Sequence, residues 1–151
     1  MINAAKNGKE VIVQIELQAR FDEKANIKYA KLLEEQGVKL IFGIQNLKVH
    51  AKVCVIERKR NNKIEKFGFI STGNFNESTA KTYTDLTLFT SNKKILNDVS
   101  KVFNFFDLNY KKFNYKYLKL SPFHTQSFFT KMIKQEIRNA KKNLPASVKI
   151  K

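Results

Sequence analysis

Cysteine and histidine are scarce in this sequence of 151 residues, which contains one cysteine and two histidines. The single thiol, Cys54, excludes an internal disulfide framework, and so few nitrogen and sulfur ligands argue against a zinc site. Long apolar runs are missing as well, because none reaches the roughly 20 residues of a membrane-spanning helix and none near the N-terminus resembles a signal peptide. We therefore expect a protein of the reducing cytoplasm.

Acidic residues are also few, since 13 Asp and Glu stand against 29 Lys and Arg, for a formal net charge of +16. Such an excess of one sign repels itself, so a polyanionic partner is expected: nucleic acid, phosphorylated small molecules or an anionic membrane surface. A lysine-rich surface that is merely solvated is the alternative for much of this charge. Tryptophan is absent, but 13 Phe and a hydrophobic content of 42% indicate a globular chain with a real core.

A strand, a helix and a second strand are expected near the start of the chain. Residues 10–19 carry the short β-branched run of a buried strand, residues 20–37 have helical periodicity, and residues 38–43 again favour a strand. Asp22 suits the N-terminal cap of this helix and Gly37 its C-terminal end. One helix face is expected to pack on the core, and its members are Phe21, Ala25, Tyr29, Leu32 and Leu33. Such a βαβ unit predicts a parallel strand pair.

A hairpin and further helices are expected in the rest of the chain. Residues 47–59 begin with the apolar–polar alternation of a strand, "RNNK" is a turn signal, and residues 64–71 return as the partner strand. The later elements are a loop with a short helical turn at 72–83, a strand at 84–90, and helices at 92–108 and 125–143. Residues 146–151 have the composition of a further strand, and residues 2–10 that of a helix end. We expect an α/β fold with a mixed sheet flanked by helices, in a single domain over residues 1–151 that is truncated at both ends.

The segment "NLKVHAKVCVIERK" over residues 46–59 contains a histidine between two lysines. On a strand, Lys48, His50 and Lys52 would share one face, because side chains alternate. Two ammonium groups favour the neutral imidazole near pH 7 and attract phosphate oxygens. A neutral imidazole beside an anchored phosphoryl group is a competent nucleophile. The alternative is a hairpin strand with a solvated polar face.

The loop "STGNFN" after the partner strand supplies hydroxyl, side-chain amide and backbone donors suited to phosphate oxygens, from Ser71, Thr72, Gly73, Asn74 and Asn76. Together with His-x-Lys, this loop resembles half of a phospholipase D-type active site, a family that transfers phosphoryl groups through a phosphohistidine. The family pattern has an acidic residue five positions beyond the lysine and then Gly-Ser-x-Asn. Here Glu57 holds the acidic position, and serine stands where glycine is usual.

A wider resemblance covers nearly the whole chain, from about Val11 onward. The segments "ELQARFDEKANIKYAKLLEEQGV", "LKVHAKVCVIERK", "STGNFNESTAKTYTDLTLFT" and "VFNFF", in this order, resemble polyphosphate kinases of the bacterial, phosphohistidine-forming type. The resemblance implies the first of two phospholipase D-like catalytic domains, taken from a protein several times longer. It therefore also implies a phospholipase D-like mixed sheet flanked by helices.

The resemblance implies a role for several residues. His50 would accept the γ-phosphoryl group of ATP and pass it to the end of the polyphosphate chain, with Lys52 holding phosphate oxygens as charge develops. Tyr83 matches a tyrosine that contacts the nucleotide, with a core aromatic as the alternative. Arg20 matches a position associated with Mg²⁺ and phosphate. Because arginine is always protonated, we interpret it as a phosphate clamp, with a salt bridge to Asp22 or Glu23 as the alternative.

Further roles are implied for residues around this centre. Lys48, Asn74 and Asn76 are expected to bind phosphate. Glu57 could orient an imidazole or pair with a lysine, and we favour the pairing. The other histidine, His124, has no partner signature and is expected to have a surface or capping role.

The implied cofactor is Mg²⁺, with ATP as a substrate. The implied partners are ATP or ADP, inorganic polyphosphate, the remaining domains of the parent chain and further copies in a homo-oligomer, and no stable nucleic-acid partner is expected. A second catalytic histidine would lie outside this chain, so the chain alone is expected to be inactive. The expected location is the bacterial cytoplasm, with membrane association left open for the full-length complex.

Two other functions remain as alternatives. One is a phospholipase D-type nuclease or phosphodiesterase half-site, which shares His-x-Lys and the asparagine loop. The other is a nucleic-acid-binding module that uses the basic, aromatic stretch "NYKKFNYKYLK" over residues 109–119.

Overall fold

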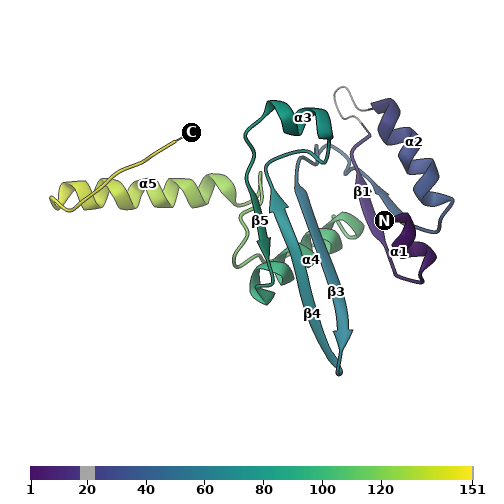
Figure 1. Cartoon of the computed structure of the whole chain (residues 1–151). Coiled ribbons are helices and arrows are strands. Elements are labelled where there is room, and N and C mark those ends of the chain that lie inside the picture. The colour runs from purple at the N-terminus through teal and green to yellow at the C-terminus, as the bar shows by residue number, and fades with distance from the viewer. Residues whose placement is uncertain (18–22, 151) are drawn as a thin grey trace. The chain divides into compact units, whose positions relative to one another are not determined.

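The computed structural model describes residues 1–17 and 23–150, which divide into two compact units, Met1–Phe113 and Asn114–Lys151. Figure 1 traces the chain through both units. Three residues with predicted roles, Arg20, Phe21 and Asp22, lie outside the described residues.

The first unit opens with the expected βαβ arrangement. A short helix α1, Ile2–Lys6, precedes strand β1, Ile12–Ile15, helix α2, Glu23–Glu34, and strand β2, Lys39–Phe42. The two strands pair in parallel, from Ile12 opposite Lys39 to Ile15 opposite Phe42. The predicted parallel pair is therefore confirmed, and the helix end expected near the N-terminus is α1.

Helix α2 ends as the sequence predicts, at a left-handed glycine. Gly37 has φ +75°, and its amide donates to the carbonyl of Glu34 at 2.9 Å, while the amide of Val38 donates to that of Leu33 at 3.1 Å. These two bonds satisfy carbonyls that the helix end leaves free. Leu33 and Val38 are both buried, at 4% exposure each, which gives this helix end its hydrophobic contact.

The predicted core face of α2 was wrong in part. Leu33 is buried as predicted, but Tyr29 is 59% exposed and Leu32 39% exposed, and Ala25 is also exposed. The buried face instead carries Ala30 and the half-buried Asn26, whose side-chain amide donates to the carbonyl of Glu16 at 2.9 Å. A polar residue lies on the inner face because it is hydrogen-bonded there, which apolar periodicity alone does not reveal.

The hairpin and its third strand follow in the first unit. Strand β3, Lys52–Arg60, pairs antiparallel with β4, Lys63–Ser71, and β4 pairs antiparallel with β5, Thr87–Thr90. Asn61 and Asn62 form the turn, with φ +48° and +57°. Positive φ at both central positions is the type I′ turn that suits a two-residue hairpin. The predicted hairpin and turn are confirmed.

The predicted start of the hairpin strand was wrong, because β3 begins at Lys52 and residues 47–51 are not part of any strand. The amide of Leu47 donates to the carbonyl of Ile44 at 3.0 Å, and that of Val49 donates to Glu16 Oε2 at 3.1 Å. Since these two amides donate to the carbonyl of a turn and to a carboxylate, they do not form the hydrogen bonds of a strand ladder. Lys48 and His50 therefore do not share a strand face with Lys52.

The buried core of the first unit forms where helix α4, Lys93–Asp107, packs on β3 and β4. Leu96 and Val99 are fully buried, and Val102 is 5% exposed. Asn92 caps the helix as its side-chain oxygen accepts from the amide of Lys94 at 3.0 Å. The helix thereby fixes the long hairpin, one end of which carries the candidate site.

The strands form two separate sheets, one with the parallel order β1–β2 and one with the antiparallel order β3–β4–β5. Short helix α3, Glu77–Thr82, connects β4 to β5. The predicted α/β class with both kinds of strand pairing is confirmed. The parallel and antiparallel strands of the described residues are not joined into one continuous sheet.

The second unit consists mainly of helix α5, Thr125–Lys141, as predicted for residues 125–143. His124 occupies the N-terminal cap position of α5, but its side chain makes no capping hydrogen bond. The strand suggested for residues 146–151 is absent from the described part of that segment, 146–150. None of the helices in the described ranges is long and apolar enough to cross a membrane.

Candidate active site at the start of strand β3

His50 and Lys52 lie together at the start of β3. The ammonium nitrogen of Lys52 lies 2.9 Å from His50 Nδ1 and 3.1 Å from Nε2. The same ammonium donates to the carbonyl oxygen of His50 at 2.8 Å. The side chain of Lys52 therefore folds back over the imidazole, which is exposed to solvent. The predicted pairing of imidazole and cation is present, although the strand geometry expected to produce it is not.

Lys52 is half-buried, unlike most lysines of this chain. Burial lowers the pKa of Lys52, and the negative charge of Asp85 opposes that shift. A partly desolvated ammonium group interacts more strongly with an oxyanion than a fully hydrated one does. Lys52 therefore has the environment expected of a group that stabilises phosphate oxygens.

Glu16, which follows β1, holds the segment that carries His50. Its carboxylate accepts from the amide of Val49 at 3.1 Å, and its carbonyl accepts from the side chain of Asn26 at 2.9 Å. This arrangement ties the residue before His50 to the end of β1 and to helix α2. The position of the imidazole is thus set by the parallel pair as well as by the hairpin.

The loop after β4 begins next to Lys52, because Ser71, the last residue of β4, is directly opposite Lys52 in the hairpin. Ser71 Oγ lies 2.8 Å from Thr87 Oγ1 and accepts from the amide of Gly73 at 3.1 Å. These bonds fold the first half of the loop back against the end of β5. The structure thereby brings together His50, Lys52 and the loop "STGNFN", as the sequence predicts.

Asp85 connects this loop to the lysine. Its carboxylate accepts from Thr72 Oγ1 at 3.0 Å, and a Cβ at Gly73 would lie 2.5 Å from Asp85 Oδ2. Glycine at position 73 therefore allows the carboxylate to approach the loop backbone closely. Asp85 is also close enough to Lys52 to favour its charged form.

The family comparison is decisive at this point. The family described as "Polyphosphate kinase C-terminal domain 1" matches residues 1–112 of this chain. The chain belongs to this polyphosphate kinase domain family. The resemblance predicted from the sequence is confirmed.

Individual relatives agree with this assignment. The polyphosphate kinase of Escherichia coli (strain K12) is 47% identical over 151 residues, which cover 100% of this chain and 22% of the relative. That of Vibrio cholerae serotype O1 is 38% identical over the same span. The crystal structure of polyphosphate kinase from Porphyromonas gingivalis matches with a TM-score of 0.78 and 33% identity, covering 94% of this chain and 24% of that one. This chain thus spans about a fifth of the length of its curated relatives.

Sequence reasoning did not identify Asp85 as a residue of the site in this polyphosphate kinase domain. The motif "KTYTD" drew attention to Tyr83, two residues earlier. The available signal was topological: β4 and β5 pair antiparallel, so the residues that enter β5 lie beside those that leave β4. An acidic residue just before β5 therefore lies close to the loop after β4. It also lies close to Lys52, which is paired with Ser71, the last residue of β4.

The remaining predicted phosphate ligands of the domain differ in their surroundings. Asn76 Oδ1 accepts from the amides of Ser78 at 2.9 Å and Thr79 at 3.2 Å, so it caps helix α3. Asn74 and Lys48 are exposed. Tyr83 ends the same helix and is 67% exposed, so the alternative of a core aromatic does not hold. The phosphate and nucleotide roles of all four residues stay predictions.

Glu57 pairs with a lysine, as favoured from the sequence. Its carboxylate lies 2.6 Å from Lys66 Nζ and accepts from Ser100 Oγ at 3.1 Å. The hydrogen bond from Lys66 is the largest cause that lowers the pKa of Glu57. Glu57 lies five positions beyond Lys52, roughly 16 Å along β3. Glu57 therefore has no part in orienting the imidazole of His50.

The described residues provide no group of three or more His, Cys, Asp or Glu side chains that could hold a metal ion. Arg20, at the position associated with Mg²⁺, lies outside these residues. Protein-bound Mg²⁺ commonly keeps several waters and is held by one or two carboxylates together with the phosphates of the substrate. The described donor set therefore does not fit a metal held by the protein alone.

Proposed function

We propose that this chain supplies the phosphate-accepting histidine of a polyphosphate kinase, a transferase that passes the γ-phosphoryl group of ATP to inorganic polyphosphate. The observation that carries the proposal is the contact of the Lys52 ammonium with His50, at 2.9 Å from Nδ1 and 3.1 Å from Nε2. The similarity to the polyphosphate kinases of Escherichia coli and Vibrio cholerae supports the same activity.

The transfer proceeds in two displacement steps. The lone pair of the unprotonated ring nitrogen of His50 attacks the γ-phosphorus of ATP, so that an N–P bond forms while the bond from that phosphorus to the bridging oxygen breaks. ADP leaves with the bonding electron pair, and the other ring nitrogen keeps its proton. A terminal oxygen of polyphosphate then attacks the phosphorus, and the N–P bond breaks to return the imidazole. Both steps depend mainly on positioning and on charge neutralisation.

Lys52 and Asp85 support these steps in different ways. Lys52 contacts the phosphoryl oxygens, where its half-buried charge stabilises the negative charge of the transition state. The negative charge of Asp85 opposes the lowering of the Lys52 pKa by burial, and its carboxylate anchors the loop through Thr72. Asp85 is thus a positioning residue and does not itself contact substrate.

Other residues complete the binding of ATP in this proposal. The exposed ring of Tyr83 stacks on adenine. Arg20 clamps a phosphate, and Lys48, Asn74 and Asn76 contribute further donors. Mg²⁺ would accompany ATP as the ion bound to its phosphates.

The rest of the parent protein is the main partner in this proposal. The chain, one phospholipase D-like domain over residues 1–151, spans about a fifth of its relatives. A second histidine and further cations would come from the other domains, so we expect the isolated chain to be inactive. The parent protein would act in the bacterial cytoplasm as a homo-oligomer.

A chimera tests the proposal. The matching 151 residues of the Escherichia coli relative are replaced by this chain, which aligns over its full length. Incubation with γ-³²P-labelled ATP and Mg²⁺ should give an acid-labile, base-stable label on the protein. His50→Ala should lower that label by roughly a thousandfold or more, because no other side chain replaces the nucleophile.

His124→Ala is the matched control, since it removes the other histidine of the chain. It should keep its label and its polyphosphate synthesis. Label that persists in the His50→Ala chimera would overturn the assignment of the nucleophile. Stoichiometric label on the isolated 151-residue chain would instead refute the expected inactivity of that chain alone.

A further inference from the structure

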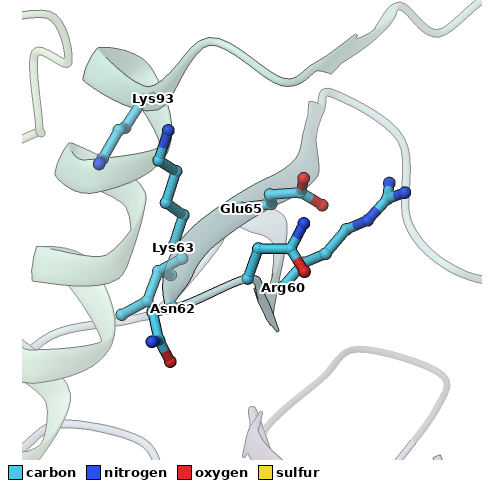
Figure 2. Close-up of a pocket in the computed structure, with 7 residues that line it drawn as sticks. Arg60, Asn62, Lys63, Glu65 and Lys93 are labelled. Carbon is cyan, nitrogen blue, oxygen red and sulfur yellow. The ribbon is translucent and has the colours of Figure 1, made fainter.

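A cationic concavity lies at the tip of the β3–β4 hairpin, at the opposite end from His50. It has a volume of about 700 Å³ and is lined by the turn and the strand ends beside it, together with the start of α4: Arg60, Asn61, Asn62, Lys63, Ile64, Glu65 and Lys93. Figure 2 shows Lys63 extending towards the start of α4, where Lys93 lies. Arg60 lies eight positions beyond Lys52, roughly 26 Å along β3, so this tip pocket is distinct from the candidate active site.

Two cross-strand pairs of the hairpin join residues of opposite charge. Glu57 is opposite Lys66, and the two side chains form an ion pair at 2.6 Å. Arg58 is opposite Glu65, and its guanidinium contacts the Glu65 carboxylate at 3.0 and 2.6 Å. These pairs follow the rule that opposite charges stabilise directly opposed strand positions.

The closing pair breaks this rule, because Arg60 is directly opposite Lys63. Like charges in that position are destabilising, and Lys93 adds a third cation to the same concavity. Glu65 is the acidic residue of the lining, but Arg58 already engages its carboxylate. Within residues 1–17 and 23–150, Arg60, Lys63 and Lys93 have no ion pair. A local rule broken without compensation in the fold indicates a site whose charge is balanced by a ligand.

We propose that the tip pocket binds a distal segment of a linear inorganic polyphosphate chain, away from the chain end that reacts at His50. Polyphosphate carries about one negative charge per phosphate, so an extended segment can meet all three cations, and the side-chain amides of Asn61 and Asn62 donate to its oxygens. This assignment rests on the proposed function for its choice of ligand.

The lining of the tip pocket favours polyphosphate over a nucleic acid. Proteins that bind single strands without sequence preference combine cations with aromatic side chains on which bases stack. None of the seven lining residues is aromatic. Phe67, the aromatic residue of β4 two positions beyond Glu65, is not part of the lining, and the guanidinium of Arg58 lies 5.3 Å from its ring centroid. The pocket thus offers charge and hydrogen bonds but no stacking platform.

Binding of fluorescently end-labelled long-chain polyphosphate to the 151-residue chain tests the proposal. Every protein carries His50→Ala and ATP is omitted, so that phosphoryl transfer does not contribute. The test variant is Arg60→Gln/Lys63→Gln/Lys93→Gln. The matched control is Lys6→Gln/Lys9→Gln/Lys28→Gln, which removes the same charge from exposed side chains of the same unit.

The tip variant should bind roughly tenfold more weakly than the control, and the slope of log K against log[salt] should be shallower by about 2. Thermal unfolding followed by circular dichroism checks that both variants remain folded. Addition of polyphosphate to the protein with an unaltered tip should also shift the backbone amide resonances of Asn61 and Asn62.

Equal affinities of the two triple variants would overturn the proposal, and so would unshifted amide resonances. An equal loss of affinity for single-stranded DNA of the same charge would show a general polyanion site and overturn the assignment to polyphosphate. A tip pocket that does not bind polyphosphate can be distinguished from a chain that lacks the proposed phosphoryl-transfer function. The tip variant should leave His50 labelling in the chimera intact, whereas loss of labelling would not change binding measured without ATP.

Discussion

The two ends of the β3–β4 hairpin use the same kinds of side chain in opposite ways. At the open end, Lys52 is half-buried and contacts His50, and the negative charge of Asp85 acts to raise its pKa. At the tip, Arg60 and Lys63 are exposed and directly opposite each other. One end therefore holds a single desolvated charge in a fixed place, and the other presents several hydrated charges to solvent.

The cations that make up the net charge of +16 therefore differ in their surroundings and in what they can do. A desolvated cation in a fixed position can stabilise a transition state, because its strength does not depend on rearranging water. Hydrated cations on a protruding turn can attract and hold a long polyanion, and salt weakens that attraction. The open end is therefore suited to stabilising a transition state, and the tip is suited to binding a polyanion.

Lys52→Met should have the largest effect on the open end. Removal of its charge should lower kcat of the chimera by roughly a hundredfold, with a smaller change in KM, because the interaction strengthens in the transition state. The control is Lys48→Met, which removes the exposed lysine on the other side of His50 and should lower kcat by less than about tenfold. Equal effects of the two substitutions would contradict the contrast between a half-buried and an exposed cation.

A pair of glycine substitutions should separate folding from function. A Cβ at Gly68 would meet the backbone carbonyl of Cys54 and lie 2.9 Å from Leu96 Cδ2. Gly68→Ala should therefore lower the free energy of unfolding by about 1–3 kcal/mol, measured by denaturant titration. Gly73→Ala meets the side chain of Asp85 instead, so it should cost less stability but reduce activity in the chimera. The reverse ranking would contradict the role of each close approach.

Asn62→Ala should reduce stability at the tip by about 1 kcal/mol, because alanine is disfavoured in the left-handed conformation. Asn62 has φ +57°. Asn62→Gly is the control and should keep the stability, since glycine adopts this conformation without a side-chain clash. Thermal unfolding of the two variants checks the difference. An equal loss in both would mean that the asparagine side chain itself, rather than the backbone conformation, stabilises the turn.

Glu57→Gln should have the smallest effect and should depend on pH. The carboxylate of Glu57 is 45% exposed, so its ion pair with Lys66 should contribute at most about 1 kcal/mol. Because the pKa of Glu57 is lowered in the fold, that contribution is present above the ordinary glutamate pKa of about 4.3 and is lost as the pH falls through the folded value. Unfolding temperatures of both proteins should differ at pH 7 and converge in acid. A constant difference down to pH 3 would exclude the ion pair as its cause.

Much of the secondary structure could be predicted because its signals are local. Gly37 ends α2, Asn61 and Asn62 form the hairpin turn, and α4 and α5 lie where helical periodicity indicated. The inner face of α2 could not be predicted in full, since Asn26 lies there through a hydrogen bond to Glu16. Apolar periodicity contains no information about a bond to a distant carbonyl.

The sequence predicted that His50 and Lys52 lie together, but not the geometry that brings them together. His50 and Lys52 meet because the lysine folds back over the ring, and not because they share a strand face. Asp85 was missed, since its proximity to Lys52 depends on the pairing of β4 with β5.

The amino-acid sequence alone was enough to predict the family, the hairpin turn and the placement of helices α2, α4 and α5, because these depend on residue types at short spacing. The start of β3 and the partial burial of Lys52 became known only from the folded structure. The structure also shows that Glu57 pairs with Lys66, too far along the strand to reach His50. It further shows that Arg60, Lys63 and Lys93 line one concavity. Each of these depends on which distant segments pack together, and burial and strand register exist only once that packing has formed.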